Sequence, residues 1–116
     1  MSGRDILKLA LGFRKFRERY FAESSTDKSS LYDKLFLEGQ APKTLVIGCS
    51  DSRVDPALLC SAAPGDLFVV RNVASLVPPY EESGTGYHGI SSAIEFAVVN
   101  LKVENVIIFG HRQCGG

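Results

Sequence analysis

Two short segments of the sequence contain residue types that bind metals and carry out hydrolytic chemistry. One reads Cys-Ser-Asp-Ser-Arg over residues 49–53, and the other reads His-Arg-Gln-Cys over residues 111–114. Cysteine and histidine are preferred zinc ligands, and a set of two cysteines and one histidine leaves the fourth position of a tetrahedral ion open. Zinc with an open position lowers the pKa of water and supplies a hydroxide nucleophile near neutral pH. Together the two segments favour a catalytic zinc site.

Each segment taken alone is ambiguous. A histidine three residues before a cysteine, as in His111 and Cys114, is a weak signal for a metal. A cysteine that follows an apolar strand, as Cys49 does, is more often part of the core, because cysteine is among the most buried residue types. The combination is more specific, because both segments follow apolar runs that are expected to be strands for independent reasons.

Asp51 has three candidate roles beside such a site. It is a fourth zinc ligand, an acceptor for the attacking hydroxide, or a residue that only forms the turn. Arg53 follows two positions later and can hold the carboxylate in a charge-assisted pair. Such a pair would keep Asp51 off the metal and leave the fourth position to water.

The elements that must position these segments are three short apolar runs rich in β-branched residues. They cover residues 44–48, 67–70 and 105–110. Continuous runs of this kind are typical of parallel strands buried on both faces. A strongly periodic helix is expected over residues 90–103 and a short one over 55–62, so helical crossovers join the strands. If the strand order is 2-1-3, the strand ends that carry residues 49–53 and 111–114 are neighbours, where ligands of open parallel sheets bind.

The beginning of the chain predicts a helical arm. Residues 4–22 form an amphipathic pattern whose charged side we interpret as a solvated helix face. A second helix is expected over residues 31–38, and Gly39 fits the position that ends a helix. The sequence therefore predicts an N-terminal helical arm over residues 1–39 and a zinc-binding α/β core with a parallel sheet over residues 40–116.

The composition is that of one ordinary globular domain. Of 116 residues, 45% are hydrophobic and 22% are charged, and 13 Lys and Arg balance 13 Asp and Glu. Without a basic excess, nucleic acid and membrane surfaces are not the expected partners. No apolar run is long enough for a transmembrane helix and no secretory signal is evident, so we expect a cytoplasmic protein. Three cysteines are too few for a disulfide scaffold.

Three motifs in this order make the sequence similar to the β-class carbonic anhydrases. They are Cys-Ser-Asp-Ser-Arg from residue 49, Val-Val-Arg-Asn-Val-Ala from residue 69, and Gly-His-x-x-Cys-Gly-Gly from residue 110. The likeness runs from about Gln40 to Gly116. It implies the parallel-sheet fold of that family and a zinc lyase that hydrates carbon dioxide reversibly to bicarbonate and a proton.

The resemblance also implies roles for particular residues. The three ligands of one zinc ion per subunit are matched by Cys49, His111 and Cys114. The pair that orients the attacking hydroxide is matched by Asp51 and Arg53, with Asp51 a fourth ligand only in a closed state of the site. Val46 stands where members with a bicarbonate-regulated closed state carry tryptophan, so we expect the open state.

Three further residues match the substrate pocket of the family, namely Gln40, Phe68 and Gly115. Active sites of the family lie between subunits, so the resemblance implies a homodimer or a higher even homo-oligomer. In that case Gln40 and Phe68 serve the zinc of the partner subunit. Phe96 stands where some plant-type members carry tyrosine, which removes one hydroxyl near the pocket.

Family members continue past the Cys-Gly-Gly motif, whereas this sequence stops there. We therefore expect an N-terminal portion of the fold in which the C-terminal part is missing. The third strand would then leave an uncovered hydrophobic edge.

Two other functions remain open. Relatives with the same ligands hydrolyse carbon disulfide or related heteroallenes, and a non-catalytic zinc-binding fragment would also keep the three ligands. The presence of Asp51 and Arg53 favours catalysis, because a purely structural zinc site does not need this pair.

Other conspicuous residues have simpler expected roles. Cys60 is expected in the core, and His88 on the surface or at a helix cap. Arg71 and Asn72, at the end of the second strand, are expected to make structural hydrogen bonds, with a contact to a partner subunit or to bicarbonate as the alternative.

Overall fold

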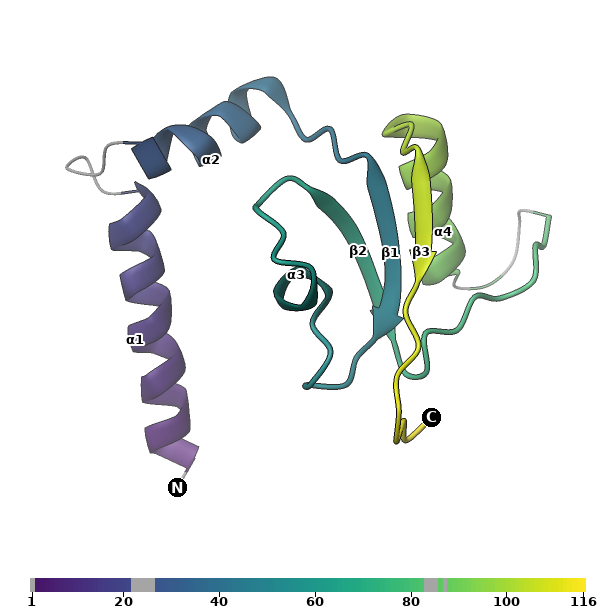
Figure 1. Cartoon of the computed structure of the whole chain (residues 1–116), viewed down its shortest axis with the longest axis horizontal. Helices are drawn as coiled ribbons and strands as arrows, with labels where there is room; N and C mark the ends of the chain where they lie inside the picture. Colours follow the sequence, from purple (N-terminus) through teal and green to yellow (C-terminus); the bar gives the residue numbers. More distant parts are fainter. Residues whose placement is uncertain (1, 22–26, 83–85, 87) are drawn as a thin grey trace. The chain divides into compact units, whose positions relative to one another are not determined.

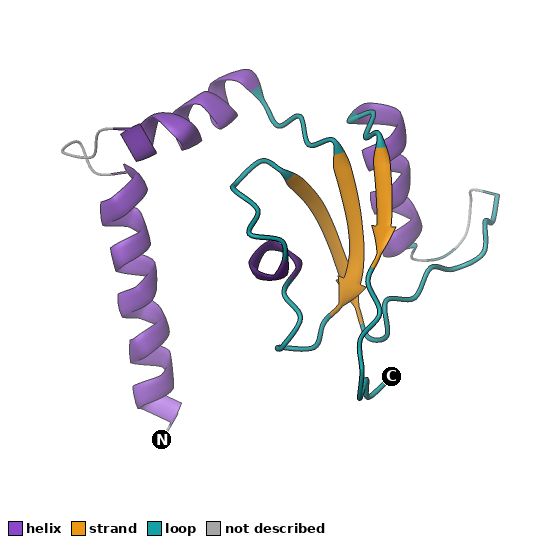
Figure 2. Ribbon diagram, in the orientation of Figure 1, coloured by secondary structure: helices purple, strands orange, loops and turns teal. Residues whose placement is uncertain are grey.

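The fold consists of two compact units, Met1–Gln40 and Ala41–Gly116, each of which is described by itself. The computed structural model of the chain describes residues 2–21, 27–82, 86 and 88–116. Its helices and strands are shown in Figure 1 and, coloured by type, in Figure 2.

The first unit contains two helices, α1 (Ser2–Phe21) and α2 (Asp27–Glu38). Helix α2 begins earlier than residue 31, where the sequence predicted it. The Tyr32 ring of α2 packs against three aromatic rings of α1, which belong to Phe16, Tyr20 and Phe21. Farther from this cluster, apolar side chains of α1 such as Ile6 and Leu9 are exposed. No helix in the described ranges is both long and apolar enough to cross a membrane.

The second unit is built on a parallel sheet in the strand order β2-β1-β3, as predicted. Strand β1 covers Thr44–Cys49, β2 covers Leu67–Asn72, and β3 covers Asn105–Ile108. The central strand β1 is buried over Leu45–Cys49, as its continuous apolar run predicts. Cys49 pairs with Asn72, so β1 and β2 end together at the carboxyl edge of the sheet.

Helices flank both faces of this sheet (Figure 1). Helix α4 (Gly89–Glu95) continues into a single π-helical turn, η1 (Phe96–Asn100), and packs over one face. The core there contains Leu45, Ile47 and Ala97, with partly buried Phe68, Val70, Ile94 and Val103 against it. The short helix α3 (Pro56–Leu59) lies at the other face, where buried Pro56 approaches Gly48 closely. Asp55 caps α3 by accepting a hydrogen bond from the Ala57 backbone N–H.

The long crossover helix departs from its predicted form. The sequence predicted one regular helix over residues 90–103, but the α-helix ends at Glu95 and a π-turn follows. In this turn the Leu101 N–H donates to the Phe96 carbonyl, five residues earlier. Val98, Val99 and Asn100 have low helix propensity, which reduces the cost of leaving the α-helix here. The wider turn still keeps Ala97 fully buried against the sheet.

Strand β3 is the exposed edge of the sheet. All four of its residues are exposed, whereas a run of this kind was expected to be buried on both faces. Among the described residues, β3 pairs only with β1, so its outer edge carries no ladder partner. The predicted uncovered hydrophobic edge is therefore confirmed.

Ile47 and Ile108 provide a direct test of where the core lies, because they are register partners on β1 and β3. Ile47 is 1% exposed and Ile108 is 58% exposed. We expect Ile47→Ala to lower the free energy of unfolding by about 2–5 kcal/mol, because it leaves a cavity in the core. Ile108→Ala should lower it by no more than about 1 kcal/mol. Urea unfolding followed by circular dichroism measures both, and equal losses would contradict this assignment of the core.

Candidate metal centre

The carboxyl ends of β1 and β3 bring the two predicted segments together. Cys49 is the last residue of β1, and His111 and Cys114 belong to the turn that follows β3. Figure 2 shows that the segments after both strands are loops at the same edge of the sheet. The side chains meet there because neighbouring parallel strands end at a common edge.

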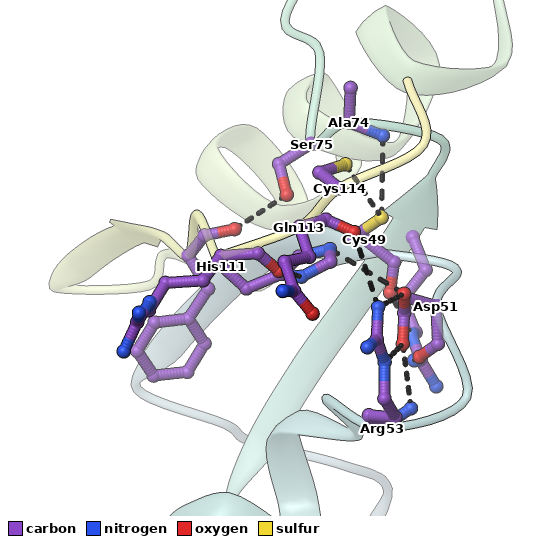
Figure 3. Close-up of polar contacts among 11 residues, drawn as sticks. Cys49, Asp51, Arg53, Ala74, Ser75, His111, Gln113 and Cys114 are labelled. Atoms are coloured by element: carbon purple, nitrogen blue, oxygen red, sulfur yellow. Dashed lines mark hydrogen bonds and ion pairs between the residues drawn. The ribbon is translucent and has the colours of Figure 1, made fainter.

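The three potential ligand atoms stand at distances that suit one metal ion. The Cys49 and Cys114 sulfurs are 3.7 Å apart. A ring nitrogen of His111 lies within 4.8 Å of each sulfur. Zinc–sulfur bonds are about 2.3 Å long, so two sulfurs at the tetrahedral angle stand about 3.8 Å apart. The pair of sulfurs, which face each other in Figure 3, therefore already has the spacing of two zinc ligands.

The histidine ring is oriented by the backbone. His111 Nδ1 lies 2.8 Å from the Arg112 carbonyl oxygen, which can only accept, so Nδ1 donates this hydrogen bond. The other nitrogen, Nε2, is buried and makes no hydrogen bond with any described residue. An unpaired buried nitrogen is costly unless something binds it. A neutral imidazole with Nδ1 fixed by a carbonyl has the form in which Nε2 binds a metal. The residues present therefore fit zinc.

The thiol of Cys49 is prepared for metal binding by its surroundings. The Ala74 backbone N–H lies 3.4 Å from the sulfur and donates to it, as Figure 3 shows. This contact, together with the Asp51 backbone N–H and the His111 side chain, lowers the pKa of Cys49 to about 6. The same sulfur and the Arg112 carbonyl raise the pKa of His111. Since a thiolate is the form that binds metals, Cys49 is suited to a ligand role near neutral pH.

Asp51 and Arg53 form the pair that the sequence predicted. Arg53 donates from Nε to one carboxylate oxygen at 3.0 Å and from Nη2 to the other at 2.7 Å, and its backbone N–H donates at 2.8 Å. These bonds hold the pKa of Asp51 well below its usual range. Arg53 Nη2 also donates to the Gln113 carbonyl, which ties the two segments together. The Asp51 carboxylate lies 3.9 Å from His111 Nε2, beside the ligand atoms but held by Arg53.

Arg71 and Asn72 make the structural hydrogen bonds expected of them. Arg71 donates from Nε to the Cys49 carbonyl and from Nη2 to the Asp51 carbonyl, both at 2.7 Å. The Asn72 side chain donates to the Leu76 carbonyl and accepts from the Leu76 N–H. Both residues thus hold turns that border the site.

The three residues matched to a substrate pocket are placed differently. Gly115 directly follows Cys114 and is exposed. Phe68 lies near the start of β2, partly buried against the core, and its ring centroid is 5.7 Å from that of the half-exposed Phe96. The structure therefore does not bring it to the metal centre of its own chain. Gln40 belongs to the first unit. The predicted pocket roles of these residues therefore remain predictions.

Sequence reasoning missed the turn after β2. Ala74 and Ser75 have positive φ angles of 74° and 52°, which non-glycine residues rarely adopt. In this backbone conformation the Ala74 N–H points at the Cys49 sulfur. The buried Ser75 hydroxyl donates to the Phe109 carbonyl. Gly116 lies so close that a Cβ there would be 2.5 Å from Val73 and 2.8 Å from Ala74. Neither Ala74 nor Ser75 is a residue type that signals such a turn.

The expectation that Cys60 lies in the core is wrong. Cys60 is exposed, and it ends the single turn of helix α3. Only Pro56 of α3 is buried, and Leu58 and Leu59 are exposed. Because α3 has a single turn, only one of its side chains, that of Pro56, is buried against the sheet. The apolar composition of this segment therefore does not indicate burial of the whole segment.

Comparison with known proteins identifies the family. A sequence model of the carbonic anhydrase family matches residues 44–116. The solved structure of the β-carbonic anhydrase CcaA has 41% sequence identity and a TM-score of 0.81, and the match covers 97% of this chain and 47% of that one. The chain belongs to the β-carbonic anhydrase family.

Other β-carbonic anhydrases support the same assignment. A tetrameric enzyme from Sordaria macrospora has 32% identity and a TM-score of 0.72, over 98% of this chain and 51% of that one. A carbonic anhydrase of Synechocystis sp. is 43% identical over 108 residues, which are 93% of this chain and 36% of that protein. The chain thus spans about a third to a half of the length of these relatives. The parallel α/β fold predicted from the sequence is confirmed.

Proposed function

We propose that this chain carries the zinc site of an enzyme that hydrates carbon dioxide reversibly to bicarbonate and a proton. One zinc ion per subunit would be held by Cys49, His111 and Cys114. The observation that carries the proposal is the buried His111 Nε2, which has no hydrogen-bond partner among the described residues and lies beside two sulfurs 3.7 Å apart. A Cys2His set fits a catalytic rather than a structural zinc site, because it leaves one position open.

When bound, zinc supplies the hydroxide that attacks carbon dioxide. The chain's own residues orient this nucleophile. Arg53 holds Asp51 as a carboxylate through two side-chain bonds and one backbone bond. Because an ionised carboxylate only accepts hydrogen bonds, Asp51 would accept one from the hydroxide and direct a lone pair at the substrate carbon. The same contacts keep Asp51 from acting as a fourth ligand, which supports the open state of the site.

The substrate pocket and the assembly are further parts of the proposal. Gln40, Phe68 and Gly115 would line the pocket, with Gln40 and Phe68 serving the zinc of a partner subunit. Phe68 is only partly buried in its own chain, which leaves part of its ring available for such a contact. We propose a homodimer or a higher even homo-oligomer, since relatives such as the Sordaria macrospora enzyme are tetrameric. Mass spectrometry under non-denaturing conditions measures the number of subunits and zinc ions together. A cytoplasmic location remains a prediction from the sequence.

Stopped-flow measurement of carbon dioxide hydration by the zinc-loaded protein tests the activity. We expect turnover that disappears when zinc is removed by a chelator and returns when zinc is added back. Carbon disulfide serves as the second substrate, and faster turnover of it would replace the proposed reaction with heteroallene hydrolysis. Bound zinc without turnover of either substrate would support a non-catalytic zinc-binding role instead.

A further inference from the structure

Arg71 connects the metal centre to strand β2. Its side chain is 27% exposed and makes three contacts. Nε donates to the Cys49 carbonyl and Nη2 to the Asp51 carbonyl, both at 2.7 Å, whereas Nη1 is 3.7 Å from the Asp55 carboxylate. The two short bonds reach carbonyls on either side of Ser50, in the turn that carries a proposed ligand and the proposed orienting carboxylate.

The planar guanidinium group suits this pair of contacts, because its donors point to two carbonyls at once. Its donors lie in a rigid planar fork, whereas the ammonium of lysine is a compact charge on a flexible stem. Two donors of Arg71 therefore fix the Cys49 and Asp51 peptide planes relative to each other and to β2. The Ser50 backbone N–H adds a third tie to β2, since it donates to the Asn72 carbonyl at 2.9 Å.

The Asp51 carboxylate needs such a restraint because it lies near the ligand position. It is 3.9 Å from His111 Nε2, so a small movement of the turn would bring it to the metal. The side chain that holds it, Arg53, is itself 58% exposed. Arg53 holds the carboxylate group itself and does not fix the peptides of Cys49 and Asp51. The backbone ties from β2 restrict the same movement from the buried side.

We propose that Arg71 is a positioning residue of the metal centre. Its fork fixes the turn from Cys49 to Asp51, so that the Cys49 sulfur stays beside Cys114 while the Asp51 carboxylate stays with Arg53 and off the metal. This inference rests on the proposed zinc site.

The test uses the chain loaded with cobalt in place of zinc, since cobalt has visible and thiolate charge-transfer absorption that reports its ligands. The variant Arg71→Lys keeps the positive charge but loses the fork. Loss of an outer partner of a metal site commonly weakens metal binding roughly 10–100-fold, and we expect a loss in this range for cobalt. We also expect thiocyanate, a ligand for the open position, to bind the variant roughly tenfold more weakly, because Asp51 competes for that position.

Two further variants show whether the effect runs through the fork and Asp51. Adding Asp51→Asn to Arg71→Lys should restore thiocyanate binding. Asp55→Asn removes the charge of the third contact but keeps a side chain that can cap α3, and it should bind cobalt and thiocyanate as the unmodified chain does. If the lysine variant does not fold, Arg71→Gln, whose shorter side chain has no guanidinium fork, takes its place.

The outcomes are distinct. Unchanged cobalt and thiocyanate affinities in a folded Arg71 variant would overturn the positioning role, and so would a thiocyanate loss that Asp51→Asn does not restore. If the unmodified chain binds cobalt without a thiolate charge-transfer band, the proposed metal site itself fails, whatever the Arg71 variants do.

Discussion

Replacing Cys49 by serine is expected to weaken zinc binding by roughly 10²–10⁴-fold. Binding of zinc to a small domain contributes about 10–16 kcal/mol, so the loss of one ligand of three or four corresponds to roughly 2.5–5 kcal/mol. Cys49 should account for a full share, because its sulfur stands 3.7 Å from that of Cys114 and accepts from the Ala74 N–H. Competition with a chromophoric chelator measures the affinity, and elemental analysis measures the zinc content.

The chain offers a matched control for this change. Cys60 is also a free cysteine but is exposed at the end of α3, so Cys60→Ser makes the same chemical change away from the site. We expect its zinc affinity to equal that of the unmodified chain. Equal losses in both variants, or full zinc affinity in Cys49→Ser, would remove Cys49 from the metal centre.

The variant Asp51→Asn is expected to keep zinc but lose most of the activity. Asparagine has nearly the same shape as aspartate but carries no charge, so it loses the charge-assisted bonds with Arg53 and can rotate a donor toward the nucleophile. A positioned acid–base group contributes typically 10²–10⁴-fold to the rate, and we expect turnover of carbon dioxide to fall by about that amount. Stopped-flow kinetics on protein of measured zinc content separates this loss from loss of metal.

Asp66 supplies the corresponding control. Its carboxylate accepts a hydrogen bond from the Ala63 N–H in the turn before β2, and asparagine can accept the same bond. Asp66→Asn should therefore leave both zinc content and turnover unchanged. If Asp51→Asn keeps full turnover with zinc bound, Asp51 has no role in orienting the nucleophile.

The convergence of the metal-binding residues was predictable because it depends on few features of the sequence. The apolar runs before Cys49 and His111 are long enough and β-branched enough to indicate buried parallel strands. Once β1 and β3 are neighbours, the residues that follow them must meet at one edge of the sheet. The Asp51–Arg53 pair was also predictable, since the two residues are close in sequence and carry opposite charge.

The backbone contacts of the site could not be predicted in the same way. The bond from the Ala74 N–H to Cys49 depends on a left-handed backbone conformation that the alanine side chain does not encode. The sequence shows that Arg71 carries several hydrogen-bond donors. The register of β1 and β2 decides which carbonyls accept from these donors. Such backbone contacts can be identified only from the three-dimensional arrangement of the strands.

Local apolar composition was misleading where burial depends on partners outside the segment. Cys60 and the leucines of α3 lie in an apolar stretch, yet the single helical turn buries only Pro56. The exposure of Ile107 and Ile108 in β3, by contrast, agrees with the uncovered edge that was predicted for this strand. Periodicity also predicted a regular helix through residues 96–100, where a π-turn is found.

The position of β1 in the middle of the sheet has a consequence for biosynthesis. Chains are made from the N-terminus at about 5–20 residues per second, so the 65 residues that separate Cys49 from Cys114 take roughly 3–13 s to synthesise. During this interval β1, the most buried strand, has been made without β3, and the Cys49 sulfur has neither His111 nor Cys114 beside it. A metal ion held by all three of the proposed ligands can therefore bind only after residue 114 has been made, and until then the Cys49 thiol must stay reduced without them.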